Sequence, residues 1–178
     1  MFLCFQYDYL KYKEKSGENE DFYTSYDYEK SIAEKHPGQL SLRSLIIAFT
    51  NEQERLMSTE KSAIGGGFTY IAKPTGQGNI ATISIKHALT KNALDVHGLW
   101  FISNNPPGDV SFCLSEKDLG KVIEFYSSNK PELEEVELAD ILDGSIAFHF
   151  TFTSLGTVYG ANHLQSGDAL DLTDYDGW

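Results

Sequence analysis

Short runs in which apolar and polar positions alternate recur along the chain, and each run predicts a β-strand. The first covers residues 2–9, where the apolar side consists of Leu3, Phe5, Tyr7 and Tyr9. The clearest alternation spans residues 146–153, in which Ile and Phe positions alternate with Ala, His and Thr. Because successive side chains of a strand point to opposite faces, we expect this segment to have one buried and one polar face.

Two further pairs of strands are predicted from turn signals between apolar runs. Residues 68–72 and 80–85 flank a turn rich in Gly and Pro at 74–79, which predicts a hairpin with a long turn. Residues 98–102 and 109–114 flank an Asn-Asn-Pro-Pro-Gly turn, and we expect them to pair across it in antiparallel fashion.

The best helical pattern of the chain covers residues 115–126. Ser115 is a good N-cap, and Asp118 three residues later completes an arrangement like a capping box. The apolar residues recur at helical spacing and would form one stripe: Leu119, Val122, Ile123 and Tyr126. The Ser-Ser-Asn sequence after this stripe and Pro131 end the predicted helix.

Residues 41–62 are ambiguous, because their apolar positions fit a helix while the run at 45–50 would also make a buried strand. We favour a strand there, followed by a polar helical turn at 51–57. Residues 11–20 are predicted to form a loop and residues 21–35 a short helix. We find no internal repeat and no domain linker. The expected fold is therefore α+β, a mainly antiparallel sheet with a few packed helices in a single domain.

The composition predicts a folded protein. Of 178 residues, 41% are hydrophobic and 13% aromatic, unlike the composition of disordered chains. Cys4 and Cys113 are too few and too far apart to imply a disulfide framework, and Cys113 lies in an apolar context that predicts a buried thiol. The N-terminus lacks the features of a secretory signal, and no apolar run approaches the roughly 20 residues that span a bilayer. We therefore expect a soluble, cytoplasmic protein.

The charge of the chain restricts its partners. There are 14 Lys and Arg against 26 Asp and Glu, which gives a formal net charge of −12. Such a charge repels nucleic-acid phosphates and anionic membranes. A basic protein partner is therefore favoured over a nucleic acid or a membrane; the alternative is that the acidity only maintains solubility.

No residue pattern points to a catalytic, metal or cofactor site. The glycines at 65–67 and 76–78 lack the lysine of a phosphate-binding loop and the spacing of a dinucleotide site, so they are interpreted as turns. The five histidines are dispersed without metal-ligand spacing. His149 falls on the polar side of its strand, where we expect it to be solvated or hydrogen-bonded. The sequence leaves open whether His149, His97 or Cys113 has a chemical role.

Two acidic stretches mix carboxylates with apolar and aromatic residues, as protein-binding surfaces do. The candidate partner-binding residues are Glu132, Glu134, Glu135, Glu137, Leu138, Asp140, Asp143, Asp171, Asp174, Tyr175, Asp176 and Trp178. The alternative is a solvated helix face for the first stretch and a mobile tail over residues 168–178 for the second.

One part of the chain resembles a family of bacterial immunity proteins. The resemblance is carried by the strand at 110–114, the Ser-started helix at 115–126 and the Pro-acid segment at 130–132. These features are similar to those of the immunity family often paired with deaminase-type toxins. That family tends to have a Trp after the Pro-Glu segment, where this chain has Leu138.

The resemblance implies an α+β inhibitor used in bacterial competition, which is not an enzyme and blocks a basic nuclease or nucleic-acid deaminase toxin by stoichiometric occlusion. The acidic stretches would accelerate encounter, and Leu138, Tyr175 and Trp178 would slow release. Two alternatives stay open. The chain would also be acidic if it were a nucleic-acid mimic directed against a defence enzyme, and a small enzyme with a spatially assembled site would leave no sequence spacing.

Overall fold

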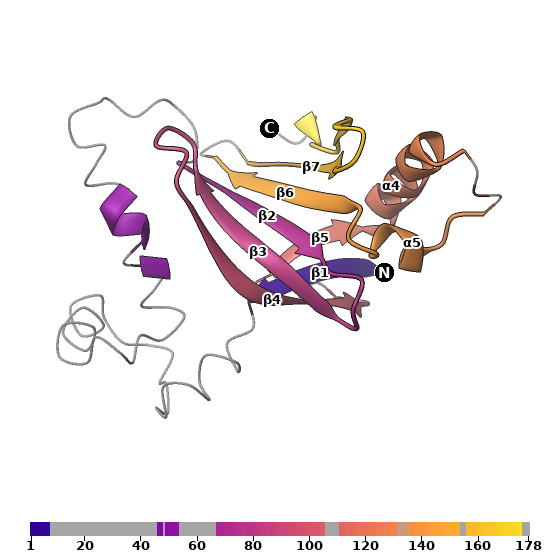
Figure 1. Cartoon of the computed structure of the whole chain (residues 1–178), viewed down its shortest axis with the longest axis horizontal. Helices are drawn as coiled ribbons and strands as arrows, with labels where there is room; N and C mark the ends of the chain where they lie inside the picture. The colour runs from indigo at the N-terminus through magenta and orange to yellow at the C-terminus, as the bar shows by residue number, and fades with distance from the viewer. Residues whose placement is uncertain are drawn as a thin grey trace.

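The protein is built on one antiparallel β-sheet, with two labelled helices packed at one end and the helical residues 49–53 near the other (Figure 1). A computed structural model describes residues 1–7, 46–47, 49–53, 67–105, 111–131, 133, 135–153 and 156–175. The strands are β1 (Phe2–Tyr7), β2 (Phe68–Pro74), β3 (Ile80–His87), β4 (Ala93–Ser103), β5 (Ser111–Ser115), β6 (Ile146–Phe152), β7 (Thr157–His163) and β8 (Ala169–Asp171). The two helices labelled in Figure 1 are α4 (Glu116–Asn129) and α5 (Leu138–Ile141).

The eight strands follow the order β5-β1-β4-β3-β2-β6-β7-β8, and the sheet curls. The ring of Phe5 on β1 lies 5.1 Å from that of Phe148 on β6, and the ring of Phe112 on β5 lies 5.4 Å from that of Phe150. These strands are not neighbours in the sheet, so the inner face must be concave and must hold the core. The predicted α+β fold with a mainly antiparallel sheet is confirmed.

Helix α4 covers one end of the sheet, where it contacts β5, β1, β7 and α5. The predicted capping box is confirmed: the Asp118 N–H donates to the Ser115 hydroxyl, and Asp118 accepts from the Ser115 N–H, both at 3.2 Å. Leu119, Val122 and Tyr126 are buried, as the apolar stripe predicts. The strand predicted at 146–153 and the hairpin of β2 and β3 are confirmed as well.

The predicted pairing of residues 98–102 with 109–114 is wrong. Both segments form strands, but β1 lies between β4 and β5 and pairs with each of them. The physical reason is that Leu3, Cys4 and Phe5 are all fully buried. A strand buried on both faces needs neighbours along both edges, and a strand inserted there separates β4 from β5.

The strand predicted at 45–50 is also wrong where the structure describes it, because residues 46–47 and 49–53 are helical. Ile46 packs against the core, the Phe49 ring lies 6.3 Å from that of Phe68, and Gln53 is buried. These three positions fall on one face of a helix. The loop predicted at 11–20 and the helix at 21–35 lie outside the described residues.

Cys4 and Cys113 form a disulfide, which contradicts the interpretation of Cys113 as an unpaired buried thiol. The two residues face each other directly in the antiparallel register of β1 and β5. This pairing could not be predicted from the sequence, because 109 positions separate the two cysteines and only the β1–β5 ladder brings them together.

The sheet contains an internal duplication, so the interpretation that the chain has no repeat is wrong. Residues 87–95 read HALTKNALD and residues 163–171 read HLQSGDALD. These segments form the β3–β4 and β7–β8 turns with the same hydrogen bonds. The Nδ1 of His87 accepts from the Thr90 N–H at 3.2 Å, and the Nδ1 of His163 accepts from the Ser166 N–H at 3.1 Å.

The two three-stranded units, β2-β3-β4 and β6-β7-β8, are related by an approximate two-fold axis in the sheet. They meet where β2 pairs with β6 in antiparallel fashion. Phe68 and Ile146 hold equivalent places, since they pair with His87 and His163. Ile71 and His149 are then equivalent as well, and they pair with each other, so the axis passes between them.

No helix among the described residues combines the length and the apolar character that crossing a bilayer demands.

Candidate functional site

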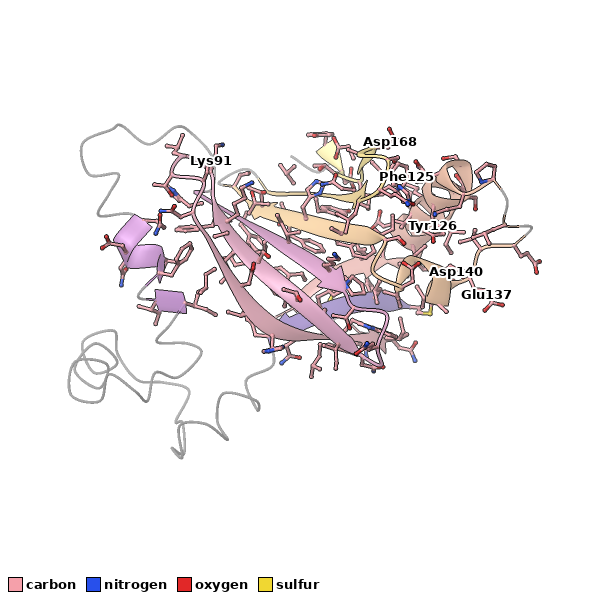
Figure 2. The ribbon with its side chains drawn as sticks, viewed as in Figure 1. Lys91, Phe125, Tyr126, Glu137, Asp140 and Asp168 are labelled. Carbon is pink, nitrogen blue, oxygen red and sulfur yellow. A yellow bond between two sulfur atoms is a disulfide. The ribbon has the colours of Figure 1, made fainter. Side chains whose placement is uncertain are left out.

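The structure gathers carboxylates around the C-terminal half of α4. Glu135, Glu137, Asp140 and Asp143 belong to the segment that contains α5, and Asp168 lies in the β7–β8 turn. Figure 2 shows Glu137, Asp140 and Asp168 at the end of the molecule that also holds Tyr126, whereas Lys91 lies at the opposite end. We call the five carboxylate residues the acidic end: Glu135, Glu137, Asp140, Asp143 and Asp168.

Tyr126 on α4 connects the two parts of the acidic end. Its hydroxyl donates to Asp143 at 3.5 Å, and its ring lies 5.9 Å from that of His163, where the β7–β8 turn begins. The turn is attached to α4 by a hydrogen bond of 2.8 Å from the Ser166 hydroxyl to Asn129. Burial raises the pKa of Tyr126, and the charges of Asp143 and Asp140 add to this effect, so the hydroxyl remains a donor.

The carboxylates of the acidic end form no ion pair with a base among the residues that the structure describes, and the nearby Lys130 instead donates to Gln165 at 3.1 Å. Between residues that the structure describes, one ion pair is present, and it joins the N-terminal amine to Glu116 at 3.4 Å. Asp143 instead accepts from the N–H and hydroxyl of Ser145, at 2.6 and 2.9 Å. Asp140 accepts from the Glu137 N–H at 2.8 Å and so caps α5. Neutral donors do not compensate a carboxylate, and five carboxylates outnumber the single nearby Lys130, which gives this end a negative potential.

The other candidate residues have different positions. Leu138 is half-buried and packs against the core, so it supports α5 rather than projecting from it. Asp171 ends β8, and Asp174 and Tyr175 follow it. Glu132, Glu134, Asp176 and Trp178 lie outside the described residues. Sequence reasoning missed Tyr126 and Asp168, although the repeated turn sequence could have singled out Asp168.

Asp171 and Tyr175 form a separate group with His149 on the outer face of the sheet. Asp171 accepts from the Tyr175 hydroxyl at 2.8 Å and from the Thr173 N–H at 2.9 Å. His149 pairs with Gly160, which in turn pairs with Asp171. The imidazole lies over Gly160, and its buried Nδ1 has no hydrogen-bond partner.

The duplication shows what is special about this group. In the first unit, the residues equivalent to His149, Gly160 and Asp171 are Ile71, Ser84 and Asp95, which pair across β2, β3 and β4. There the Ser84 hydroxyl donates directly to Asp95. In the second unit the absence of a side chain at Gly160 makes room for the imidazole of His149. Burial lowers the pKa of His149, while the charge of Asp171 opposes this shift. His149 is thus half-buried rather than simply solvated.

The lowered pKa of His149 predicts a contribution to the pH dependence of stability. Between about pH 7 and pH 5 the unfolded state protonates this histidine more readily than the folded state, so the free energy of unfolding should fall as pH falls. His149→Gln should make this slope shallower, as measured by urea denaturation at several pH values. Hydrogen bonds from Thr173 lower the pKa of Asp171, so Asp171 contributes only at lower pH. An unchanged slope in the variant would contradict the assignment.

Neither a metal site nor a known relative identifies a function for these residues. Within the described ranges, no group of three or more His, Cys, Asp and Glu side chains is arranged to hold a metal ion. Comparison of the chain with protein-family models, curated proteins and solved structures found no match.

Proposed function

We propose that this chain is an acidic immunity protein, which binds a basic toxin domain and neutralises it by stoichiometric occlusion. A nuclease or a nucleic-acid deaminase is the favoured toxin, because such enzymes bind polyanions and so present cationic surfaces. The observation that carries the proposal is the acidic end, where five carboxylates lie together and none forms an ion pair among the described residues.

Charge and apolar surface have separate tasks in this proposal. Negative potential at the acidic end accelerates encounter with a cationic surface, and the gain falls as salt screens the charges. Exposed apolar side chains then slow release. Leu133, 38% exposed, precedes α5, and Tyr175, 56% exposed, follows β8, so both expose apolar surface to a partner.

The proposal is tested with the product of the adjacent upstream gene as the candidate toxin. The two purified proteins should form a 1:1 complex at low and moderate salt, and one equivalent of this chain should abolish toxin activity. Inactivation by far less than one equivalent would indicate an enzyme and overturn the proposal. Binding to many unrelated DNA-binding proteins would overturn it in favour of a nucleic-acid mimic.

Removing two charges from the acidic end should slow complex formation. The variant Glu135→Gln/Asp168→Asn raises the net charge by two and leaves the α5 cap and the Asp143 hydrogen bonds intact. We expect its association rate at low salt to fall by about 3- to 10-fold, with little change in dissociation. Stopped-flow measurement over a salt series gives both rates.

The matched control is Leu89→Lys/Ala93→Lys, which raises the net charge by the same amount at the β3–β4 turn. Both residues are exposed, and this turn holds Lys91 at the opposite end of the molecule (Figure 2). The control should bind at close to the wild-type rate. If both variants slow association equally, total charge rather than the acidic end controls encounter.

A further inference from the structure

A pocket of about 410 Å³ opens between β5 and the start of α4 on one side and β6 and β7 on the other. Its volume falls in the range of about 300–1,000 Å³ that small-ligand sites occupy. It is lined by Phe2, Phe112, Cys113, Ser115, Asp118, Phe150, Phe152, Thr157 and Tyr159. None of these residues belongs to the acidic end.

Aromatic rings form much of the pocket wall. The ring of Phe112 lies 5.4 Å from that of Phe150 and 5.9 Å from that of Phe152. The rings of Phe150 and Tyr159 are nearly parallel, at 9° and 6.3 Å. Phe152 is 49% exposed and therefore lies where the pocket meets solvent. Such a wall offers ring faces, which carry partial negative charge and attract cations.

One carboxylate, that of Asp118, lies among these rings and is only 7% exposed. Its Oδ2 accepts from the Ser115 hydroxyl at 2.6 Å, from the Ser115 N–H at 3.2 Å and from the Tyr159 hydroxyl at 3.4 Å. All three donors reach the same oxygen, so the capping role of Asp118 leaves Oδ1 available to a ligand.

The potential in the pocket is negative. All three donors to Asp118 are neutral, so none of them supplies a positive charge that would compensate the carboxylate. A second carboxylate, Asp174, lies close enough to act on the same tyrosine: burial raises the pKa of Tyr159, and the charges of Asp118 and Asp174 raise it further. The N-terminus of α4 carries only about half a positive charge, which does not cancel a full carboxylate.

We propose that this pocket binds the guanidinium group of an arginine side chain. Guanidinium is planar, so it stacks on the Phe152 or Tyr159 ring, and its N–H groups can donate to Asp118 Oδ1 while it does so. The Thr157 hydroxyl supplies a further acceptor on the wall. A lysine ammonium lacks the plane, and a neutral group leaves the carboxylate without a counter-charge.

We assign this arginine to the basic toxin domain. Only this assignment of the source rests on the proposed function. The acidic end would attract the toxin from a distance, and the pocket would then hold one arginine, which slows dissociation. The preference of the pocket for guanidinium is a property of this chain and can be tested without any toxin.

The first experiment is an NMR titration of the ¹⁵N-labelled full chain with Nα-acetyl-arginine-N-methylamide and, separately, with its citrulline analogue. Citrulline has nearly the shape of arginine but no charge. The arginine compound should shift the amide signals of Phe150, Phe152 and Tyr159 with millimolar affinity, and citrulline should bind at least about tenfold more weakly. Equal affinities, or no shifts at these residues, would overturn the proposal.

Two variants separate the carboxylate from the rings. Asp118→Asn keeps an acceptor for the helix cap and should abolish the preference for arginine over citrulline. Phe152→Ala removes an exposed ring and should weaken the binding of both compounds. Asp95→Asn is the matched control, because it removes the same charge on β4, outside the pocket lining, and should retain the preference.

The toxin complex then distinguishes the two proposals. If the arginine preference holds and Asp118→Asn dissociates from the toxin more than about tenfold faster than wild type, both stand. Unchanged dissociation of that variant from the toxin overturns the assignment of the arginine to the toxin and leaves the immunity function intact. Arginine binding without any toxin binding overturns the proposed function alone.

Discussion

Replacement of both Cys4 and Cys113 by alanine is expected to lower the free energy of unfolding by about 2–5 kcal/mol. The disulfide joins residues 109 positions apart, so it removes many conformations from the unfolded chain. In the loop-entropy description, a closed loop of about 100 residues contributes close to 5 kcal/mol. Both cysteines lie in the β1–β5 ladder, and Cys4 is fully buried, which makes alanine a better replacement than serine.

Urea denaturation with and without a reductant measures this effect and supplies its control. The wild-type protein should lose stability when the disulfide is reduced, whereas the double alanine variant should respond little to the reductant. If the urea midpoint of the wild-type protein is the same under both conditions, the disulfide contributes nothing to stability and this prediction is wrong.

Gly160→Ser is expected to destabilise the protein by about 3 kcal/mol. A β-carbon at this position would lie 2.8 Å from Cε1 of His149 and would overlap the carbonyl oxygen of Leu170. The oxygen belongs to the backbone of β8, so relief requires β7 and β8 to move apart. Strand propensity alone would favour serine over glycine, so the sign of the effect tests the steric argument directly.

The duplication provides the matched control for this variant. Ser84→Gly, at the equivalent position of the first unit, should cost only about 1 kcal/mol, from the added backbone freedom and the lost hydrogen bond to Asp95. The double variant His149→Ile/Gly160→Ser reproduces two residues of the first unit and should recover part of the lost stability. A Gly160→Ser variant as stable as wild type in urea would refute the argument.

Elements with strong local signals could be predicted from the sequence. Helix α4 has a complete capping box and a regular apolar stripe, and β6 alternates over its whole length. The acidic residues near α5 were visible from composition. The helical turn predicted at 51–57 is present at 51–53, but the helical residues before it were predicted as a strand, because their apolar run fits a buried strand and the packing of Phe49 on Phe68 is a tertiary contact.

The arrangements that depend on strand order could not be predicted. No local pattern states that β1 separates β4 from β5, and the disulfide follows from that insertion. The pocket arises because the sheet curls and brings Phe112 and Asp118 beside Phe150 and Tyr159. The duplication escaped detection because the two units share their turn sequences, whereas strand positions such as Ile71 and His149 have diverged.

The position of β1 also has a consequence for how the chain is synthesised. Each three-stranded unit closes over short connections, but β1 can pair only with β4 and β5, whose residues leave the ribosome roughly a hundred positions later. Among the strands that the structure describes, β1 is therefore the one whose partners are synthesised after the longest delay. Until then its apolar Leu3-Cys4-Phe5 sequence remains uncovered on the nascent chain, where a chaperone can bind it.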